Sequence, residues 1–318
     1  MAILVVGAGI AGVACARALL AGGADVRVVD RARMVGGRMA TGQLGRPGRP
    51  VDLGAAYFTA DDDGFAAVVA GWQARGLARP WTDTLTVFDD NGRHPAPGPM
   101  RWAAPGGLRS LVGDLADGLD ITLEHPVTEV GPGPVVAGRG YAAVVLAMPD
   151  PQAARVLTPA SPTRALLTGA DEVTWAPVIA VAAEFPARTW PDFDAAFVND
   201  HDTLSLLADD GARRGDHVPV LVAHTTATVA RAHDANPDDT VPPALAAMRD
   251  LLGISADPVW THAHHWRLAQ PDRHRDAAFH LGADGIGLAG DVWGRPRVQT
   301  AWCSGTALAT ELLSRSIG

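Results

Sequence analysis

The feature that most constrains this chain lies near its start, where a short apolar run meets a glycine-rich turn. Residues 2–6, "AILVV", have the continuous hydrophobicity of a buried parallel strand. The turn "GAGIAG" follows and gives the G-x-G-x-x-G spacing at Gly7, Gly9 and Gly12. The first glycine permits a tight turn, the second lets a pyrophosphate approach the backbone, and the third lets helix and strand pack closely.

The residues after this turn complete a dinucleotide-binding unit. We expect a helix over roughly Ile10 to Ala21, with the positive end of its dipole at the phosphates. "GGADVRVVD" then predicts a second strand ending at Asp30, close to the spacing of an acid that binds a ribose hydroxyl. Glycines at this spacing also occur in turns that only pack, but the full order of elements predicts a dinucleotide site. These residues leave open whether the dinucleotide is NAD(P) or FAD.

Composition restricts the partners and the chemistry. The chain has 318 residues and a formal net charge of −9 without a basic run, which argues against a nucleic-acid partner. It contains no lysine, so Schiff-base and lysine catalysis are excluded. Cys15 and Cys303 form no C-x-x-C pair, and Cys303 is interpreted as a small helix residue rather than a flavin attachment. The N-terminus lacks a basic signal-peptide region and no stretch is apolar enough to span a bilayer, so we expect a cytoplasmic protein.

A second glycine motif follows the acid and narrows the choice of dinucleotide. "DRARMVGGRMAT" places Gly36, Gly37 and Arg38 after Asp30, with Thr41 beyond them. A glycine pair beside an arginine provides another close backbone approach and a cation for phosphate. The pattern D-x-x-x-x-x-G-G-R-x-x-T resembles the motif of flavin amine oxidases, in which it supports FAD. The resemblance implies noncovalent FAD as the cofactor.

The stretch "VDLGAAYFTA" at residues 51–60 extends this resemblance. G-G-R followed by D-L-G-A-x-Y is similar to the renalase branch of the same superfamily. By that resemblance, Gly54 and Ala55 run under the isoalloxazine ring, and Tyr57 and Phe58 line the catalytic cavity. Without it, the same residues indicate a strand bent at Gly54 with Tyr57 in the core.

The end of the chain resembles the C-terminal flavin motif of this superfamily. "IGLAGD" predicts a strand ending in Gly290 and Asp291, followed by a loop and a small-residue helix from about Val298. The resemblance places Asp291 by the ribityl and pyrophosphate groups. It also places the amides near Thr300 and Ala301 at the pyrimidine side of the flavin, where a helix N-terminus stabilises the reduced ring.

The resemblance implies an α/β fold in which a Rossmann-type FAD-binding domain is combined with a discontinuous second α+β substrate domain, as in amine oxidases and p-hydroxybenzoate hydroxylase. We expect the FAD domain at residues 1–58, 104–150 and 281–318, and the substrate domain at 59–103 and 151–280. The motifs and the resemblance together assign to FAD the residues Gly7, Gly9, Ile10, Ala11, Gly12, Asp30, Arg31, Gly37, Arg38, Gly54, Ala55, Val127, Gly290, Asp291, Gln299, Thr300 and Ala301. Family members often carry Glu where Gln299 stands, which argues against a charge-based role at that position.

Further segments are predicted with less specific patterns. "EHPVTEV" at 124–130 is similar to the strand whose backbone at Val127 contacts adenine in related flavoproteins. The Pro- and Gly-rich stretches "GRPGRP" at 45–50 and "HPAPGPM" at 94–100 are interpreted as loops. "APVIAVAAEF" at 176–185 and "VPVLVAHTTATV" at 218–229 predict strands of a mixed sheet over the flavin.

Four residues are candidates for the substrate side: Tyr57, Trp266, Arg267 and His224. An arginine can hold a phosphate or carboxamide, and a tryptophan can stack on a flat ring, although a structural Trp–Arg pair is an equal alternative. His224 is a candidate proton relay, against the commoner case of a hydrogen-bonded strand histidine. The run "THAHHW" at 261–266 holds no Cys, Asp or Glu, so we expect no metal.

The resemblance implies an oxidase of renalase type. Such enzymes oxidise the 2- and 6-dihydro isomers of NAD(P)H to NAD(P)+ by hydride transfer to flavin N5, and dioxygen is reduced to hydrogen peroxide. The alternative is a flavin amine oxidase or desaturase acting on a small metabolite, although amine oxidases place near flavin N5 a lysine that this chain lacks. A flavin-binding protein without turnover is a third possibility. The expected partners are therefore a dihydronicotinamide dinucleotide or an amine, together with O2; the sequence does not specify an oligomeric state.

Overall fold

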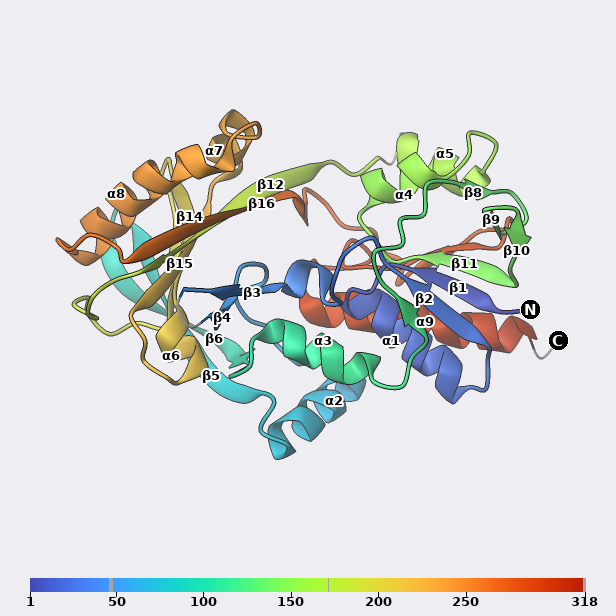
Figure 1. The fold of residues 1–318 in the computed structure, drawn as a ribbon, viewed down its shortest axis with the longest axis horizontal. Coiled ribbons are helices and arrows are strands. Elements are labelled where there is room, and N and C mark those ends of the chain that lie inside the picture. Colours follow the sequence, from blue (N-terminus) through green and yellow to red (C-terminus); the bar gives the residue numbers. More distant parts are fainter. Residues whose placement is uncertain (46–47, 171, 317–318) are drawn as a thin grey trace. The chain divides into compact units, whose positions relative to one another are not determined.

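The computed structural model describes residues 1–45, 48–170 and 172–316, which divide into two compact units (Figure 1). Unit 1 comprises Met1–Arg38, Val112–Thr174 and Pro271–Gly318, and unit 2 comprises Met39–Leu111 and Trp175–Gln270. Each unit has its own sheet and core. Three elements include residues of both units: the short 3-10 helix η1 (Gly37–Met39), α3 (Leu108–Ala116) and β16 (Trp260–Pro271), whose last residue belongs to unit 1.

Unit 1 is built on a mainly parallel sheet. Its strand order is β17-β18-β11-β1-β2-β7, and every neighbouring pair is parallel except β17 and β18. The strands are β1 (Ile3–Val6), β2 (Val26–Val29), β7 (Ile121–Thr122), β11 (Ala143–Leu146), β17 (His280–Leu281) and β18 (Ile286–Leu288). All residues of β1, β11 and β18 are buried, as expected for parallel strands covered on both faces. The predicted Rossmann-type architecture is confirmed.

Two helices of unit 1 pack closely together beside this sheet (Figure 1). These are α1 (Ile10–Ala21) and α9 (Val298–Ser316). A Cβ atom at Gly305 of α9 would collide with the carbonyl oxygen of Ala11 in α1, so the glycine permits the close approach. The remaining elements of unit 1 are α4 (Asp150–Val156), α5 (Pro162–Thr168) and the small sheet of β8 (Val130–Gly131), β9 (Val135–Val136) and β10 (Arg139–Gly140).

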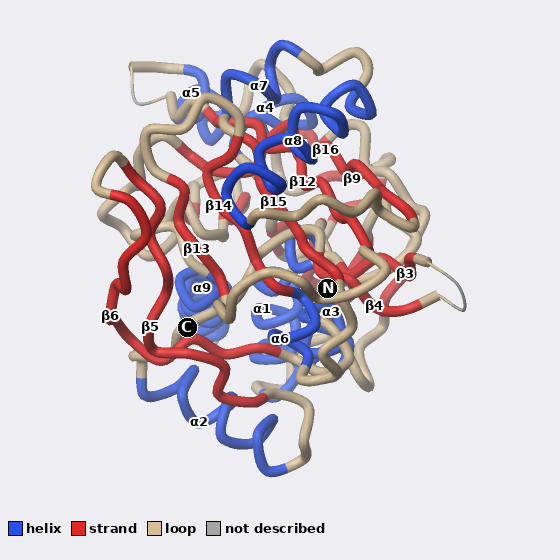
Figure 2. The backbone as a smooth tube through the Cα atoms, turned by 90° about the vertical axis from the view of Figure 1, so that its left-hand side faces the viewer, coloured by secondary structure: helices blue, strands red, loops and turns tan. Residues whose placement is uncertain are grey.

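Unit 2 is built on a seven-stranded mixed sheet in the order β16-β12-β15-β14-β13-β5-β6 (Figure 2). Its strands are β5 (Arg79–Asp89), β6 (Gly92–Ala103), β12 (Trp175–Glu184), β13 (Ala195–Val198), β14 (Leu204–Asp209), β15 (Val220–Thr225) and β16 (Trp260–Pro271). The separate hairpin consists of β3 (Thr41–Leu44) and β4 (Arg49–Asp52). The helices are α2 (Asp63–Ala74), α6 (Asp210–Arg214), α7 (Ala227–Ala232), η2 (Pro237–Thr240) and α8 (Val241–Leu252).

Different elements pack against the two faces of this sheet. On one face, Ile179, Val181 and Leu207 belong to a core that includes Ala230 of α7 and Met248 of α8. On the other face, Ala180, Ala182 and Val222 pack against Val51 of β4 and Leu53 just beyond it. The chain around "VDLGAAY" therefore lies on the sheet face opposite to α7 and α8.

Two local expectations are wrong, and a third, the loop at 45–50, is wrong at its end. Residues 94–100, interpreted as a loop, belong to β6, which pairs with β5 at the edge of the sheet. Proline donates no hydrogen bond but is tolerated on an edge strand, whose outer side has no partner strand. Of residues 124–130, predicted as a strand, just Val130 lies in one, at the start of β8. In the stretch 45–50, residues 46–47 lie outside the described part of the chain, and Arg49 and Pro50 belong to β4.

The compact units differ from the expected domain boundaries at residues 39–58 and 104–111, which belong to unit 2. The apolar contacts of Val51 and Leu53 with the seven-stranded sheet account for the first of these differences. Residues 151–174 and 271–280 lie in unit 1 rather than with the rest of the expected substrate domain. The functional roles of the two domains stay a prediction.

Candidate functional site

The first glycine turn of unit 1 is shaped by close backbone contacts. Gly7 has φ +115°, and a Cβ atom there would come within 2.5 Å of the carbonyl oxygen of Ala147. A Cβ at Gly12 would collide with the carbonyl oxygen of Gly7. Gly9 differs, because the nearest atom to a Cβ there would be the Gly37 Cα at 3.9 Å. The first and third glycines are therefore needed for packing, whereas the second leaves space above the backbone.

The second glycine pair lies directly beside the first turn. The amide of Gly36 donates to the carbonyl oxygen of Ala8 at 2.9 Å, and Gly9 and Gly36 form a β-bridge. Gly37 has φ +52°, and a Cβ atom there would lie 3.2 Å from the Gly9 Cα. The two motifs thus form one continuous backbone surface without side chains at the N-terminus of α1. No side chain caps that helix end, so its amides are available to an anion.

Asp30 follows β2 and is held by backbone amides. Its carboxylate accepts hydrogen bonds from the amide of Ala8 at 2.6 Å and from the amide of Ala32 at 2.7 Å. The segment 124–127 lies close by, because His125 donates its amide to the carbonyl oxygen of Asp30 at 2.8 Å. Val127 lines a surface cavity of about 190 Å³. The acid and the expected adenine segment are therefore neighbours in unit 1, while Arg31 is exposed.

Arg38 and Asp291 form a bidentate ion pair within unit 1. Nη1 of Arg38 lies 2.9 Å from Oδ2 of Asp291, and Nη2 lies 2.5 Å from Oδ1. Both side chains are partly buried, which strengthens the pair relative to an exposed one. The G-G-R and G-D motifs, 253 residues apart in sequence, thus meet through these two side chains.

The start of α9 adds a second helix N-terminus. The amide of Gly290, between β18 and α9, donates to Ser304 Oγ of α9 at 3.1 Å. Gln299 and Ala301 are buried, and Thr300 donates its hydroxyl to the carbonyl oxygen of Arg295 at 2.6 Å. This arrangement holds the loop after β18 against the first turns of the helix.

These features of unit 1 fit a dinucleotide. A glycine surface that a Cβ would fill, an uncapped helix N-terminus and an arginine beside them suit a pyrophosphate, and Asp30 suits a ribose hydroxyl. FAD would supply a reversible hydride acceptor, which no amino-acid side chain offers. The residues of unit 1 would hold its adenosine and pyrophosphate portions.

In unit 2, the "VDLGAAYF" segment separates two environments. Phe58 is 2% exposed and packs in an aromatic cluster with Phe65, Trp72 and Trp102, so it belongs to the core rather than to a cavity wall. Tyr57 is partly exposed, and the guanidinium of Arg101 lies 5.5 Å from the centre of its ring. Arg101 is 7% exposed and donates to the carbonyl oxygen of Asp83 at 3.0 Å.

The sheet face below this segment carries His224. The strand registers place Ala180 and Leu206 opposite His224, so all three point to the same face. Burial, and secondarily the charge of Arg213, lowers the pKa of His224 to about 4. The imidazole is therefore neutral at physiological pH.

Trp266 lies on this same face of the sheet, in β16. Its Nε1 donates to the carbonyl oxygen of Leu53 at 2.7 Å, and its ring centre lies 4.4 Å from that of His264. Burial, and secondarily the neighbouring His262, lowers the pKa of His264. The charge of Arg109 acts on His264 in the same direction.

Arg267, the second candidate from the same strand, points the other way. Adjacent strand residues face opposite sides, and Arg267 donates to Asp234 Oδ1 at 2.8 Å. Its side chain is 68% exposed. The structure thus places His224 and Trp266 on one face of the sheet, with Tyr57 packed beside Leu206 of that face, and Arg267 on the opposite face.

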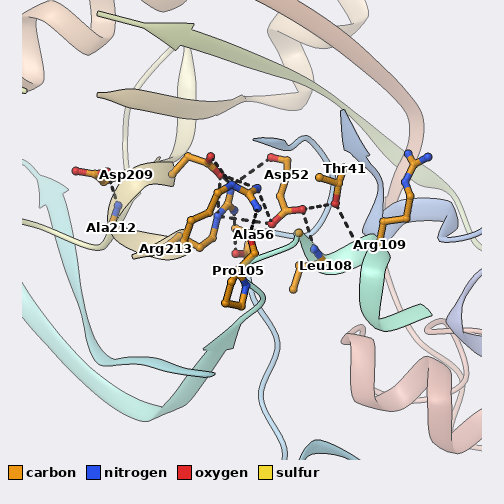
Figure 3. A network of polar contacts seen from close by, with 12 residues as sticks. Thr41, Asp52, Ala56, Pro105, Leu108, Arg109, Asp209, Ala212 and Arg213 are labelled. Carbon is orange, nitrogen blue, oxygen red and sulfur yellow. Dashed lines mark hydrogen bonds and ion pairs between the residues drawn. The ribbon is translucent and has the colours of Figure 1, made fainter. Parts of the chain in front are cut away.

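A buried polar network anchors the "VDLGAAY" segment (Figure 3). Asp52, Asp210, Arg213 and Arg214 are each at most 5% exposed. Oδ1 of Asp52 accepts from Thr41 Oγ1 at 2.5 Å and from the amide of Leu108 at 2.9 Å.

The arginines of this network balance its carboxylates. Arg214 donates to Asp210 Oδ2 at 2.8 Å and lies 3.3 Å from Asp52 Oδ2. Burial alone would raise the pKa of Asp210, but the charges of Arg213 and Arg214 hold it below its usual value. Two carboxylates thus lie against two guanidinium groups in this buried network.

Asp52, Arg101 and Arg213 were missed as functional candidates from the sequence. The spacing of Asp210 to Arg213 and Arg214, at i+3 and i+4, does predict helical ion pairs, but such pairs are usually exposed. Among the described residues, no group of three His, Cys, Asp or Glu side chains could hold a metal ion. Within the same ranges, no helix has the length and hydrophobicity to cross a membrane.

Comparison with known proteins places this geometry in a family. Residues 65–313 match the family described as flavin containing amine oxidoreductase, and residues 5–71 match the NAD(P)-binding Rossmann-like domain. The fold is similar to cyclohexylamine oxidase from Brevibacterium oxydans IH-35A, with TM-score 0.78, 18% identity and 99% of each chain covered. It is also similar to putrescine oxidase bound to putrescine, with TM-score 0.73, 16% identity, and 99% of this chain and 100% of that one covered. The chain belongs to the family of flavin-containing amine oxidoreductases, and it is an FAD-dependent oxidoreductase.

Proposed function

We propose that this oxidoreductase oxidises the 2- and 6-dihydro isomers of NAD(P)H to NAD(P)+, with dioxygen as the electron acceptor. The observation that carries the proposal is the character of one surface in unit 2, which we call the substrate surface. It is formed by Tyr57, Phe197, Leu206, His224, His264 and Trp266. None of these side chains is a carboxylate.

The charge of the substrate surface disfavours a cationic ligand. Its histidines His224 and His264 have lowered pKa values, and the guanidinium of Arg101 lies over the Tyr57 ring. A protonated amine would meet a positive charge here and no partner of opposite charge. A dihydronicotinamide ring is neutral and flat, and the dinucleotide that carries it is anionic.

The proposed reaction asks for little acid–base chemistry. Bound FAD would supply the two-electron chemistry, and in the overall reaction the substrate, O2 and a proton would yield NAD(P)+ and hydrogen peroxide. The protein must orient a flat ring and exclude water. Aromatic and aliphatic side chains serve this purpose, and Trp266 is held in one orientation by its hydrogen bond to Leu53.

The proposal gives each group of cofactor residues a part of FAD to bind. The amides of Gly9 to Gly12 and Arg38 would hold the pyrophosphate, and Asp30 would bind the ribose. By resemblance, Gly54 and Ala55 run along the isoalloxazine ring. Arg267 has no role in the proposal, because its ion pair with Asp234 lies on the opposite face of the sheet.

Oxidation of a small amine is the second candidate, and family membership favours it. An amine oxidase needs the unprotonated amine at the flavin. Nearby positive charge favours that form, because it disfavours the ammonium ion. The absence of lysine from the chain counts against the water-linked lysine found in many amine oxidases.

The test is anaerobic mixing of the purified holoprotein with borohydride-reduced NAD and NADP, which contain the 2- and 6-dihydro isomers. Pure 4-dihydro cofactor is the matched control, because it has the same charge and the same adenosine portion. We expect rapid bleaching of the flavin band with the isomer mixture, slow or absent bleaching with the control, and recovery in air with formation of peroxide.

Putrescine and cyclohexylamine are the comparison substrates. Flavin bleaching by either amine, without bleaching by the isomer mixture, would overturn the proposal in favour of amine oxidation. Equal rates with all dihydronicotinamides would also contradict it, since the ring position of the hydride would then not matter.

A further inference from the structure

Beyond Leu53, whose amide still donates to the carbonyl oxygen of Ala40 at 3.1 Å, the backbone after β4 is held by side chains rather than by a strand ladder. β4 ends at Asp52, and the next strand-like contact is the bridge of Phe58 with Trp102. Between them, the carbonyl oxygen of Leu53 accepts from Trp266 Nε1 at 2.7 Å. The carbonyl oxygen of Ala56 accepts from Nη1 of Arg213 at 2.9 Å.

Arg213 contacts this segment at both ends. Besides Ala56, its Nη2 donates to the carbonyl oxygen of Asp52 at 3.3 Å (Figure 3). The two accepting carbonyls lie on either side of the Gly54–Ala55 step. One planar guanidinium therefore spans the step, which a single ammonium group could not do.

Arg213 is itself fixed. Its side chain is 1% exposed, and its Nε donates to Asp210 Oδ1 at 3.1 Å, with a further hydrogen bond from Nη2 to the same oxygen. Asp210 is the first residue of α6 and is also held by Arg214. The position of the guanidinium is thus set by a buried, charge-balanced network that holds the segment rigidly.

We propose that Arg213 is a positioning residue that sets the course of the backbone at Gly54 and Ala55 and thereby tunes the flavin that the proposed function places along these two residues. The inference rests on that placement of the flavin. Because a guanidinium bonded to both flanking carbonyls fixes the plane of the intervening peptides, its loss changes the distance between this backbone and the ring. The expected consequences are a slower hydride transfer and a changed reduction potential, with substrate affinity little affected.

The test compares Arg213→Lys with Arg214→Lys in the FAD-loaded protein. Both variants keep the positive charge, lie on α6 and retain an ion pair with Asp210. Arg214 bonds the carbonyl oxygen of Pro105 instead of those of Asp52 and Ala56, so it serves as the matched control. The measurements are the flavin reduction potential, the visible spectrum, and the limiting rate and half-saturation concentration for anaerobic flavin reduction by the borohydride-reduced NAD mixture.

We expect Arg213→Lys to lower the limiting rate of reduction by about tenfold or more, with a shifted potential and a nearly unchanged half-saturation concentration. Arg214→Lys should keep the rate within about twofold of wild type while losing a similar amount of thermal stability. Equal rates and potentials for wild type and Arg213→Lys would overturn the inference. An equal loss of the reduction rate in Arg213→Lys and Arg214→Lys would also overturn it.

The reduction potential separates this inference from the proposed function. If the wild-type flavin is not reduced by the isomer mixture, the proposed function fails, yet a potential shifted in Arg213→Lys and unchanged in Arg214→Lys still supports the positioning role. If the mixture reduces wild type and Arg213→Lys at equal rates and their reduction potentials agree, the proposed function stands and the positioning role fails.

Discussion

The same kind of side chain takes different roles in this protein because its surroundings differ. Asp30 bonds two backbone amides at the edge of the glycine surface, whereas Asp52 is buried among arginines. Similarly, Gly7 and Gly12 are required by packing, and Gly9 is not. A residue's position in a motif does not by itself state which of these roles it has.

The difference between the glycines makes a direct test of cofactor binding possible. Gly9→Asp should abolish FAD retention, because the carboxylate would occupy the space of the pyrophosphate and repel it. The folded chain should survive, since the nearest atom to a Cβ there is 3.9 Å away. The measurement is the ratio of flavin absorbance to protein absorbance after purification, together with circular dichroism.

Gly140→Asp is the matched control for this variant. A Cβ at Gly140 meets no atom within 4 Å, and the residue lies in β10, away from the glycine turns. It should stay fully loaded with FAD. A yellow, fully loaded Gly9→Asp protein would contradict the cofactor assignment.

His224 predicts a pH dependence of stability. Its pKa is lowered from 6.5 to about 4 in the folded protein by burial, so the unfolded chain binds a proton first as the pH falls. Its contribution to stability is complete above pH 6.5 and is lost progressively as the pH falls from 6.5 towards 4. The loss amounts to up to about 3 kcal/mol.

The measurement is urea unfolding of wild type and His224→Gln at pH 7 and pH 5. The variant should show a smaller difference between the two pH values than wild type, because it lacks this titration. An identical pH dependence in both proteins would show that His224 is not buried in its neutral form.

At the scale of elements, the short helix α6 has an influence beyond its five residues. It presents Asp210, Arg213 and Arg214 to the interior, and these contact β4, the segment after it and Pro105 in the stretch before α3. A surface helix of this length would contribute little, but buried ion pairs depend on each partner. The helix therefore acts as an anchor for three separate stretches of chain.

Asp210→Asn should destabilise the protein by about 3 kcal/mol or more, because two buried arginines lose their common counter-ion. The measurement is the free energy of unfolding in urea at pH 7. Asp238→Asn, an exposed change in η2, is the matched control and should lie within about 0.5 kcal/mol of wild type. Equal effects of the two substitutions would contradict the buried network.

At the scale of the whole molecule, FAD binding and folding are linked. Unit 1 is assembled from three separate stretches of the chain. The Arg38–Asp291 pair connects the first with the last, and the first glycine turn packs against Ala147 of the second. A ligand that binds the folded form stabilises it by about 2.7 kcal/mol at a hundred times its dissociation constant.

Adding FAD to the apoprotein should therefore raise the melting temperature, and riboflavin at the same concentration should not. Riboflavin carries the same ring but lacks the pyrophosphate that the helix N-terminus and glycine surface suit. Differential scanning fluorimetry measures both. A riboflavin effect as large as that of FAD would show that the pyrophosphate contributes little.

Much of unit 1 was predictable because its signals are local. The turn glycines, the strand before them and the helix after them depend on neighbouring residues, so α1 begins and ends where the spacing predicts, at Ile10 and Ala21. The prolines of residues 94–100 predicted a loop wrongly, because proline is compatible with a strand at the edge of a sheet. An edge strand such as β6 tolerates them, and edge position is a property of the sheet, not of the segment.

The sequence by itself determined the cofactor class, since the spacing of glycines, acid and arginine states which backbone atoms can approach a dinucleotide. Tertiary structure alone decided the rest of the candidate site. Because Trp266 and Arg267 are adjacent in β16, their side chains lie on opposite faces of the sheet, and the tertiary structure decided which face each one occupies. Folding also brought Arg213 to a carbonyl 157 residues earlier in the chain. Such contacts depend on which distant segments are buried together, and no pattern of adjacent residues records that choice.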